Sequence, residues 1–79
     1  MKVNVLFFGA TADITGNRRV EVEIAHGSTA LAVSESIIAR YPRLAFHNLH
    51  ISLNQQYAIG HELLSDGDEI AVFTAVSGG

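Results

Sequence analysis

The sequence contains no cysteine and only one proline among its 79 residues. Without cysteine the chain forms neither a disulfide framework nor a thiolate metal site. A domain of this length is near the lower limit for a core without such cross-links, so burial of apolar side chains must stabilise it. The hydrophobic content of 48% is ample for one two-layer domain.

Basic residues are also scarce. Five lysines and arginines stand against eight acidic residues, which gives a formal net charge of −3. They do not cluster beyond the pair Arg18-Arg19, and this excludes nucleic-acid binding through phosphate neutralisation. No apolar run approaches the roughly 18 residues of a membrane span, and the N-terminal apolar stretch is too short for a signal peptide. We therefore expect a cytoplasmic protein that binds neither nucleic acid nor a membrane.

Two stretches near the N-terminus alternate apolar and polar residues, as β-strands do. In residues 2–8 the odd positions form the predicted core face: Val3, Val5 and Phe7. Leu6 and Phe8 then point to the opposite face. Residues 18–24 alternate more strictly, and the polar segment 9–17 is predicted to be the loop between the two strands.

Residues 30–41 show helical spacing. Ser28 or Thr29 offers a hydroxyl for the N-cap, and Pro42 ends the helix because the residue before a proline is disfavoured in the α region. The expected buried face consists of Ala30, Leu31, Ser34, Ile37, Ile38 and Tyr41. Further strands are predicted over residues 50–54 and 69–75, with a turn at residues 54–57.

One helix cannot cover both faces of a sheet with four strands. The uncovered face is predicted to carry Leu6, Phe8, Phe73 and Tyr57. Aromatic side chains on an open sheet face indicate a protein partner. The alternative is that loops cover these side chains.

The sequence contains no self-contained catalytic or metal-binding motif. His47 and His50 have helical spacing, but His50 begins a predicted strand, so surface or partly buried histidines are expected. The acidic turn at residues 65–69 lacks the further ligands of a calcium loop. If this domain takes part in chemistry, it acts as a substrate or carrier.

The chain stops on Gly78-Gly79, directly after the apolar run of residues 70–75. A Gly-Gly end has no side-chain bulk and can lie extended in a narrow channel, where it offers the Gly79 carboxylate to another protein's active site. Simple fraying is the alternative. We expect a folded domain over residues 1–75 and an extended tail over residues 76–79.

The chain resembles the small, sulfur-carrier subunit of molybdopterin synthase, of the ubiquitin-like MoaD/ThiS family. The resemblance spans essentially the whole chain and rests on four segments: Val5-Leu6-Phe7-Phe8-Gly9, Asn54-Gln55-Gln56-Tyr57, Leu64-Ser65-Asp66-Gly67-Asp68-Glu69-Ile70-Ala71 and Val76-Ser77-Gly78-Gly79. It implies an α+β fold of the ubiquitin-like β-grasp type, with a mixed four- to five-stranded sheet packed on one main helix.

The resemblance also implies a reaction sequence in molybdenum cofactor biosynthesis. A ubiquitin-activating-type adenylyltransferase would adenylate Gly79 with ATP and Mg²⁺, and a sulfur donor protein would supply the sulfur for a C-terminal thiocarboxylate. The tail, formed by Val76, Ser77 and Gly78 before Gly79, would enter the large subunit of molybdopterin synthase and donate sulfur to cyclic pyranopterin monophosphate. The chain itself would bind no cofactor or metal and supply no catalytic side chain to this sulfurtransferase complex.

By the same resemblance, Phe8, Tyr57 and Phe73 form the patch that contacts the large subunit. The sequence departs from the family pattern at Thr74-Ala75, where prolines are common, and at Ala12-Asp13, where Arg-Glu is common. Two alternatives stay open. One is a sulfur carrier for thiamine thiazole, cysteine or a secondary metabolite, and the other is a ubiquitin-like modifier or interaction module.

Overall fold

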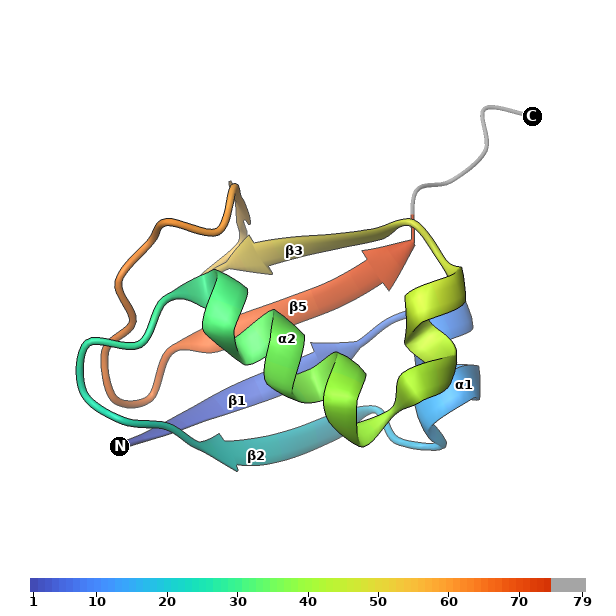
Figure 1. The fold of residues 1–79 in the computed structure, drawn as a ribbon, viewed down its shortest axis with the longest axis horizontal. Helices are drawn as coiled ribbons and strands as arrows, with labels where there is room; N and C mark the ends of the chain where they lie inside the picture. The colour runs from blue at the N-terminus through green and yellow to red at the C-terminus, as the bar shows by residue number, and fades with distance from the viewer. Residues whose placement is uncertain (75–79) are drawn as a thin grey trace.

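The computed structural model describes residues 1–74, which form a sheet with helices on one face and at one end. The elements in chain order are β1 (Lys2–Phe7), α1 (Ala10–Thr15), β2 (Arg19–Glu23), α2 (Ala30–Arg40), the 3₁₀ helix η1 (Pro42–Phe46), β3 (Leu49–Leu53), β4 (Gln56–Ala58) and β5 (Glu69–Thr74). Helix α2 crosses one face of the sheet, and α1 lies at the end where β1 and β5 finish (Figure 1). The predicted boundary between the domain and its tail lies outside the described residues.

The five strands form one mixed sheet in the order β2-β1-β5-β3-β4. Strands β1 and β5 run parallel at its centre, and the other neighbours are antiparallel. The parallel register pairs Val5 with Ile70 and Phe7 with Val72, so these side chains share one face. The predicted α+β class, with a mixed four- to five-stranded sheet packed on one main helix, is confirmed, and the sheet has five strands.

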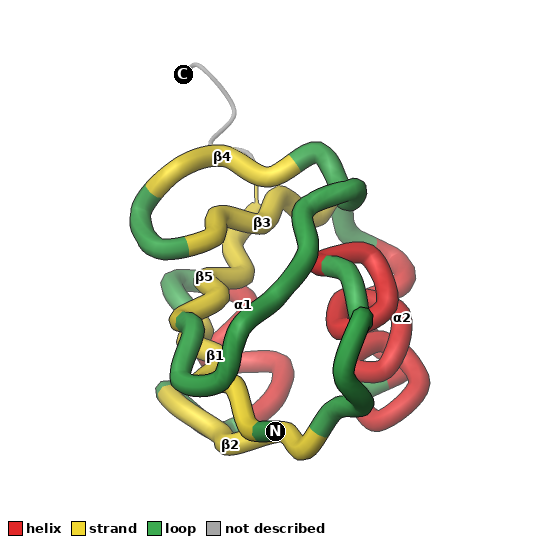
Figure 2. Tube along the Cα trace, turned by 90° about the vertical axis from the view of Figure 1, so that its left-hand side faces the viewer, coloured by secondary structure: helices red, strands yellow, loops and turns green. Residues whose placement is uncertain are grey.

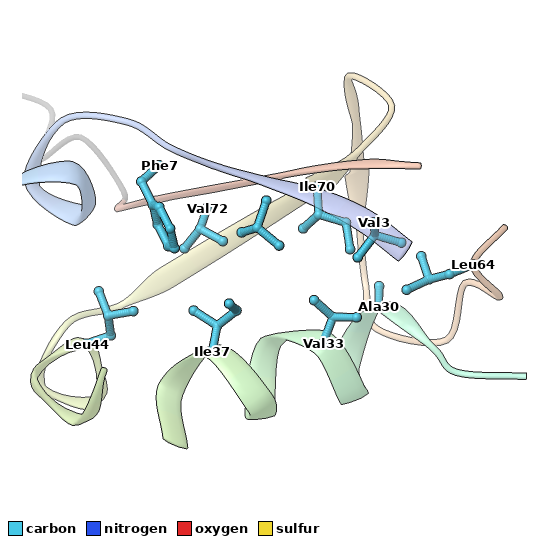
Figure 3. Packing of buried hydrophobic residues seen from close by; sticks show 10 residues of the cluster. Val3, Phe7, Ala30, Val33, Ile37, Leu44, Leu64, Ile70 and Val72 are labelled. Atoms are coloured by element: carbon cyan, nitrogen blue, oxygen red, sulfur yellow. The ribbon is translucent and has the colours of Figure 1, made fainter. Parts of the chain in front are cut away.

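Ten buried apolar side chains fill the space between the sheet and the helices (Figure 3): Val3, Val5, Phe7, Ala30, Val33, Ile37, Leu44, Leu64, Ile70 and Val72. Full burial of one such valine, leucine or isoleucine contributes about 1.5–3 kcal/mol. Val20 and Val22 of β2 pack against this core and are partly buried. The alternation predicted for the first two strands is therefore correct.

Helix α2 begins where Thr29 caps it, because Thr29 Oγ1 accepts a hydrogen bond from the Ala32 N–H at 3.3 Å. Its buried face consists of Ala30, Val33 and Ile37, the spacing of a single helical stripe. Leu31, expected on this face, is 51% exposed. Each helical residue turns the chain by about 100°, so a side chain next to Ala30 points away from the stripe.

Residues 10–15 form the short helix α1, where the sequence pattern predicts only a loop. Gly9 precedes the helix at φ 58° and ψ −128°, a conformation that glycine adopts at little cost. Thr11 is the fully buried residue of α1. The helix was not predictable from apolar periodicity because its most buried side chain carries a hydroxyl.

The predicted turn at residues 54–57 is partly a strand. Asn54 and Gln55 form a two-residue turn with φ values of 48° and 72°. Positive φ at both central residues is typical of the type I′ turns that join hairpin strands. Gln56 and Tyr57 belong to β4 and pair with β3, so Tyr57 is a sheet residue.

Candidate functional site

Within residues 1–74, no helix covers the face of the sheet opposite α2 (Figure 2). Strand side chains alternate between faces, so Leu6, Ala71 and Phe73 point to this open face while their neighbours in sequence enter the core. Leu6 pairs with Ala71 in the parallel register, and His50 pairs with Phe73 in the antiparallel one. Apolar residues of β1 and β5 therefore lie side by side, and His50 of β3 lies next to them.

Phe73 is the centre of an aromatic group on this face. Its ring centroid lies 5.9 Å from that of Tyr57 on β4, with an interplanar angle of 58°. The imidazole of His50 on β3 also stacks on the Phe73 ring, with centroids 5.9 Å apart and an interplanar angle of 22°. Tyr57 is 79% exposed and Phe8 is 53% exposed. Aromatic side chains this open to water are typical of a protein-binding surface.

An open hollow of about 400 Å³ adjoins the aromatic group. Leu6, Phe8, Ala71 and Phe73 supply its apolar walls, and Glu69 also lines it. We define the aromatic face as Leu6, Phe8, Tyr57, Ala71 and Phe73. The structure thus brings together Phe8, Tyr57 and Phe73, the three sequence-predicted docking residues. Their role in binding a partner stays a prediction.

The position of Phe8 is set by a buried hydroxyl. Thr11 Oγ1 accepts a hydrogen bond from the Phe8 N–H at 3.0 Å and lies 2.8 Å from the Val72 carbonyl oxygen. The Phe8 N–H is also 3.2 Å from that carbonyl oxygen. This network joins the end of β1 to β5. It therefore fixes Phe8 relative to Phe73, one residue beyond Val72.

The acidic turn at residues 65–69 is part of the scaffold. Asp66 Oδ1 accepts a hydrogen bond from the Lys2 N–H at 2.8 Å, and Asp68 Oδ2 accepts one from the Ser65 N–H at 2.7 Å. Backbone donors occupy one oxygen of each carboxylate, which stabilises the turn. These acidic residues join the start of β1 to the turn before β5.

Glu62 has a structural role for which the sequence carries no signal. Its carboxylate accepts hydrogen bonds from the Ile59 N–H at 2.9 Å and the Gly60 N–H at 2.8 Å. The bond from Ile59, supported by that from Gly60, holds the pKa of Glu62 below its usual value. The carboxylate thereby orders the loop after β4, in which Ile59 is 82% exposed.

The histidines do not assemble a metal centre in the part of the chain that is described. No group of three or more histidine, aspartate or glutamate side chains gathers among residues 1–74. His50 stacks on Phe73 instead. The same residues include no helix that is long and apolar enough to cross a membrane.

The predicted reactive end, Gly79, lies outside the described residues, as do Ala75, Val76, Ser77 and Gly78. Strand β5 ends at Thr74, directly after Phe73 of the aromatic face. Strands β1 and β5 both finish at the same end of the molecule (Figure 1). A partner seated on the aromatic face therefore lies next to the point where the chain continues beyond Thr74.

The central parallel pair β1–β5, with α2 across one face, defines the ubiquitin-like β-grasp class of proteins. The crystal structure of SAMP1 from Haloferax volcanii has the same arrangement, with a TM-score of 0.88 over 100% of both chains. Its sequence identity to this chain is 24%, so this likeness concerns the fold alone.

The chain belongs to the ThiS family, whose model matches residues 5–79. The molybdopterin synthase sulfur carrier subunit of Mycobacterium tuberculosis is 37% identical to it, covering 100% of this chain and 99% of that protein. The corresponding Homo sapiens protein is 36% identical over 99% of this chain and 94% of its own length. The family resemblance read from the sequence is confirmed.

One solved structure similar to this chain comes from an assembly, the protein–protein complex of subunits 1 and 2 of the molybdopterin-converting factor from Helicobacter pylori. The matched chain is 27% identical, has a TM-score of 0.71 and is covered completely, as is the present chain. At least one structural relative therefore forms a heteromeric complex.

Proposed function

We propose that this protein is a sulfur carrier in molybdopterin synthesis and that the carboxyl group of Gly79 carries the sulfur as a thiocarboxylate. The observation that carries the proposal is the similarity, over the full chain, to the Mycobacterium tuberculosis sulfur carrier subunit at 37% identity. The family match extends to Gly79 and so includes the Gly-Gly end. The β-grasp scaffold supports the proposal because it presents its aromatic face beside the strand that leads to that end.

The carboxylate must first be activated, because it is a poor electrophile. In our proposal an adenylyltransferase of the ubiquitin-activating type uses ATP and Mg²⁺ to form the Gly79 acyl-adenylate and releases pyrophosphate. Sulfide delivered by a sulfur donor protein attacks the carbonyl carbon, a C–S bond forms, and AMP leaves with the electron pair of the broken C–O bond. The chain supplies the reacting group, its partners supply the catalytic groups, and the reaction takes place in the cytoplasm.

We assign the aromatic face to the large subunit of molybdopterin synthase. Tyr57 and Phe8 are open to water and Phe73 immediately precedes Thr74, so a partner seated there is placed to receive the residues beyond β5. In the proposed reaction those residues enter the large subunit, and the thiocarboxylate donates its sulfur to cyclic pyranopterin monophosphate. The complex of subunits 1 and 2 from Helicobacter pylori supports a partner of this kind.

Intact-mass spectrometry tests the carrier chemistry. The chain is incubated with the adenylyltransferase, ATP, Mg²⁺ and sulfide, and we expect the mass to rise by the difference between a sulfur and an oxygen atom. Omitting ATP should abolish the rise. Deletion of Gly79 should abolish loading and leave the unfolding free energy unchanged. If the truncated chain still supports sulfur transfer, the carrier proposal is wrong.

Reconstitution with a defined acceptor tests the pathway. We expect the loaded chain, mixed with the large subunit and cyclic pyranopterin monophosphate, to produce molybdopterin. A loaded chain that gives no molybdopterin but is recovered with a thiazole synthase would contradict the pathway and preserve the carrier chemistry. Isopeptide adducts on lysines of other proteins, without any thiocarboxylate, would identify a modifier instead.

A further inference from the structure

A second hollow borders the aromatic face. It shares Leu6 and Phe8 with the first hollow and continues past the end of β1 toward α1 and the start of β2. Arg19 of β2 lines this hollow, as does Arg18, the residue before the strand. Asp13 of α1 lines it as well. A partner that covers Leu6 and Phe8 therefore also comes close to Arg18 and Arg19.

Arg19 is held in place by a neutral acceptor. It pairs with Leu6 in the antiparallel register, and its Nη2 donates a hydrogen bond to Asn4 Oδ1 at 2.9 Å. Because an amide oxygen carries no formal charge, this bond orients the guanidinium without neutralising it. Two arginines against one aspartate leave one net positive charge at the second hollow.

Negative charge lies on the open sheet face near the start of β1, beyond the aromatic face. Asn4 pairs with Glu21 on one side and with Glu69 on the other. Glu69 lines the first hollow and stands at the border of the aromatic face. The aromatic face thus has arginines on its β2 side and a carboxylate on the side away from the end of β5. A partner with matching charges can dock in one orientation only.

We propose that the partner on the aromatic face places an aspartate or glutamate side chain against Arg18 and Arg19, and that this contact orients docking. The identity of the partner rests on the proposed function. Covering Leu6 and Phe8 excludes water from the neighbouring guanidinium groups, and an unpaired charge without water is costly. A carboxylate compensates best because it accepts two parallel hydrogen bonds from an arginine. The hollow is continuous with an apolar protein-docking face, so the anion is a protein side chain.

Binding to the molybdopterin synthase large subunit tests the proposal. The double variant R18E/R19E should bind at least about tenfold more weakly than the wild type, and the neutral variant R18Q/R19Q should fall between them. R40E/R43E makes the same charge change on α2 and η1, away from the second hollow, and should bind within about threefold of the wild type. Circular dichroism and thermal unfolding identify any variant that fails to fold.

The outcomes separate the two hypotheses. If the wild-type chain does not bind the large subunit, the assignment of the partner under the proposed function is wrong. The orienting contact at Arg18 and Arg19 is wrong if the wild type binds and R18E/R19E binds as tightly as the wild type. It is also wrong if R18E/R19E and R40E/R43E lose equal affinity. The contact is supported when R18E/R19E alone loses affinity and the loss exceeds that of R18Q/R19Q.

Cross-linking identifies the carboxylate and does not depend on affinity. Lys2 is the only lysine of the chain, so Arg19→Lys adds one new side-chain amine beside the second hollow. A carbodiimide condenses an amine with a carboxylate in direct contact and gives an amide. We expect an amide between position 19 and an acidic residue of the large subunit, and none from the Arg43→Lys control. Equal yields at both positions, or no product at position 19, would overturn the proposal.

Discussion

The side chains of Asn54 and Asp68 meet at 3.1 Å although 14 positions separate them in the sequence. Asn54 Oδ1 also accepts a hydrogen bond from the Glu69 N–H at 3.0 Å. The hairpin turn after β3 is therefore tied to the turn before β5. The Asp-Gly-Asp-Glu segment, which carries much of the family resemblance, acts here as a joint between two turns.

Breaking this joint should destabilise the domain. Asn54→Ala removes both side-chain hydrogen bonds and places an alanine at φ 48°. We expect the free energy of unfolding, measured with urea, to fall by about 1–3 kcal/mol. Asn48→Ala, at an exposed position just before β3, is the control and should change it by less than about 0.5 kcal/mol. Equal effects of the two substitutions would mean that the hydrogen bonds of Asn54 do not contribute to the free energy of unfolding.

The neighbouring position offers a stabilising change. Gln55 lies at φ 72°, where an L-residue with a Cβ is strained. Gln55→Gly creates the Asn-Gly pair favoured in type I′ turns and should raise the free energy of unfolding by about 0.5–1 kcal/mol. Thermal unfolding measures this as an increase in Tm. A lower Tm would show that the turn does not bear strain at Gln55.

The two faces of the sheet should respond differently to loss of a phenylalanine. Phe73→Ala removes a side chain from the aromatic face and should weaken binding to the large subunit more than it lowers stability. Phe7→Ala opens a cavity in the core and should cost about 3–5 kcal/mol. Urea unfolding and a binding titration on both variants make the comparison. A stability loss of about 3 kcal/mol or more for Phe73→Ala would place this residue in the core.

Thr11 should stabilise the folded domain through its hydroxyl group rather than through the volume of its side chain. Thr11→Val keeps the shape and leaves the buried Val72 carbonyl oxygen without its side-chain partner. We expect a loss of about 1–3 kcal/mol in the free energy of unfolding. Thr11→Ser retains the hydroxyl and should lose clearly less. If the serine variant is the less stable of the two, packing rather than hydrogen bonding fixes α1 to β5.

Glu62 should make the loop after β4 sensitive to acid. The folded state lowers the pKa of Glu62 from its usual value of 4.5, so its stabilising contribution is present above that pH. The contribution is lost as the pH falls through the lowered pKa, where the carboxylate becomes protonated. Hydrogen exchange at the Ile59 and Gly60 amides should therefore show protection at pH 7 that decreases in acid. Glu62→Gln should weaken this pH dependence. Identical pH profiles of exchange in the wild type and the variant would refute the role of Glu62.

Local patterns in the sequence predicted most of the fold because the elements concerned bury one regular stripe. Val3, Val5 and Phe7 alternate, and α2 has both a capping threonine and a proline that ends it. Helix α1 and strand β4 lack such a stripe. Thr11 is stabilised by a contact 61 positions away, and Tyr57 belongs to a strand only because β3 pairs with it. Neither cause is visible in a local window.

In the candidate site, too, local patterns predicted some features and the pairing of distant strands determines the others. Alternation alone put Leu6, Phe8 and Phe73 on the open face, where the structure has them. The contact between Tyr57 and Phe73 depends on the hairpin register, and the place of Arg19 beside Leu6 depends on how β2 pairs with β1. Residues of several strands form this surface, so the relative placement of its charges required the three-dimensional structure.

The central place of β5 has a consequence for protein synthesis. This strand is the last described element in the chain, yet it lies between β1 and β3 and supplies Ile70 and Val72 to the core. A nascent chain that has not yet emerged from the ribosome beyond Thr74 leaves both neighbouring strand edges unpaired and cannot complete the fold. A partner that recognises Phe8 and Phe73 together therefore binds only chains that have been synthesised to the end of β5. Shorter nascent chains do not compete for it.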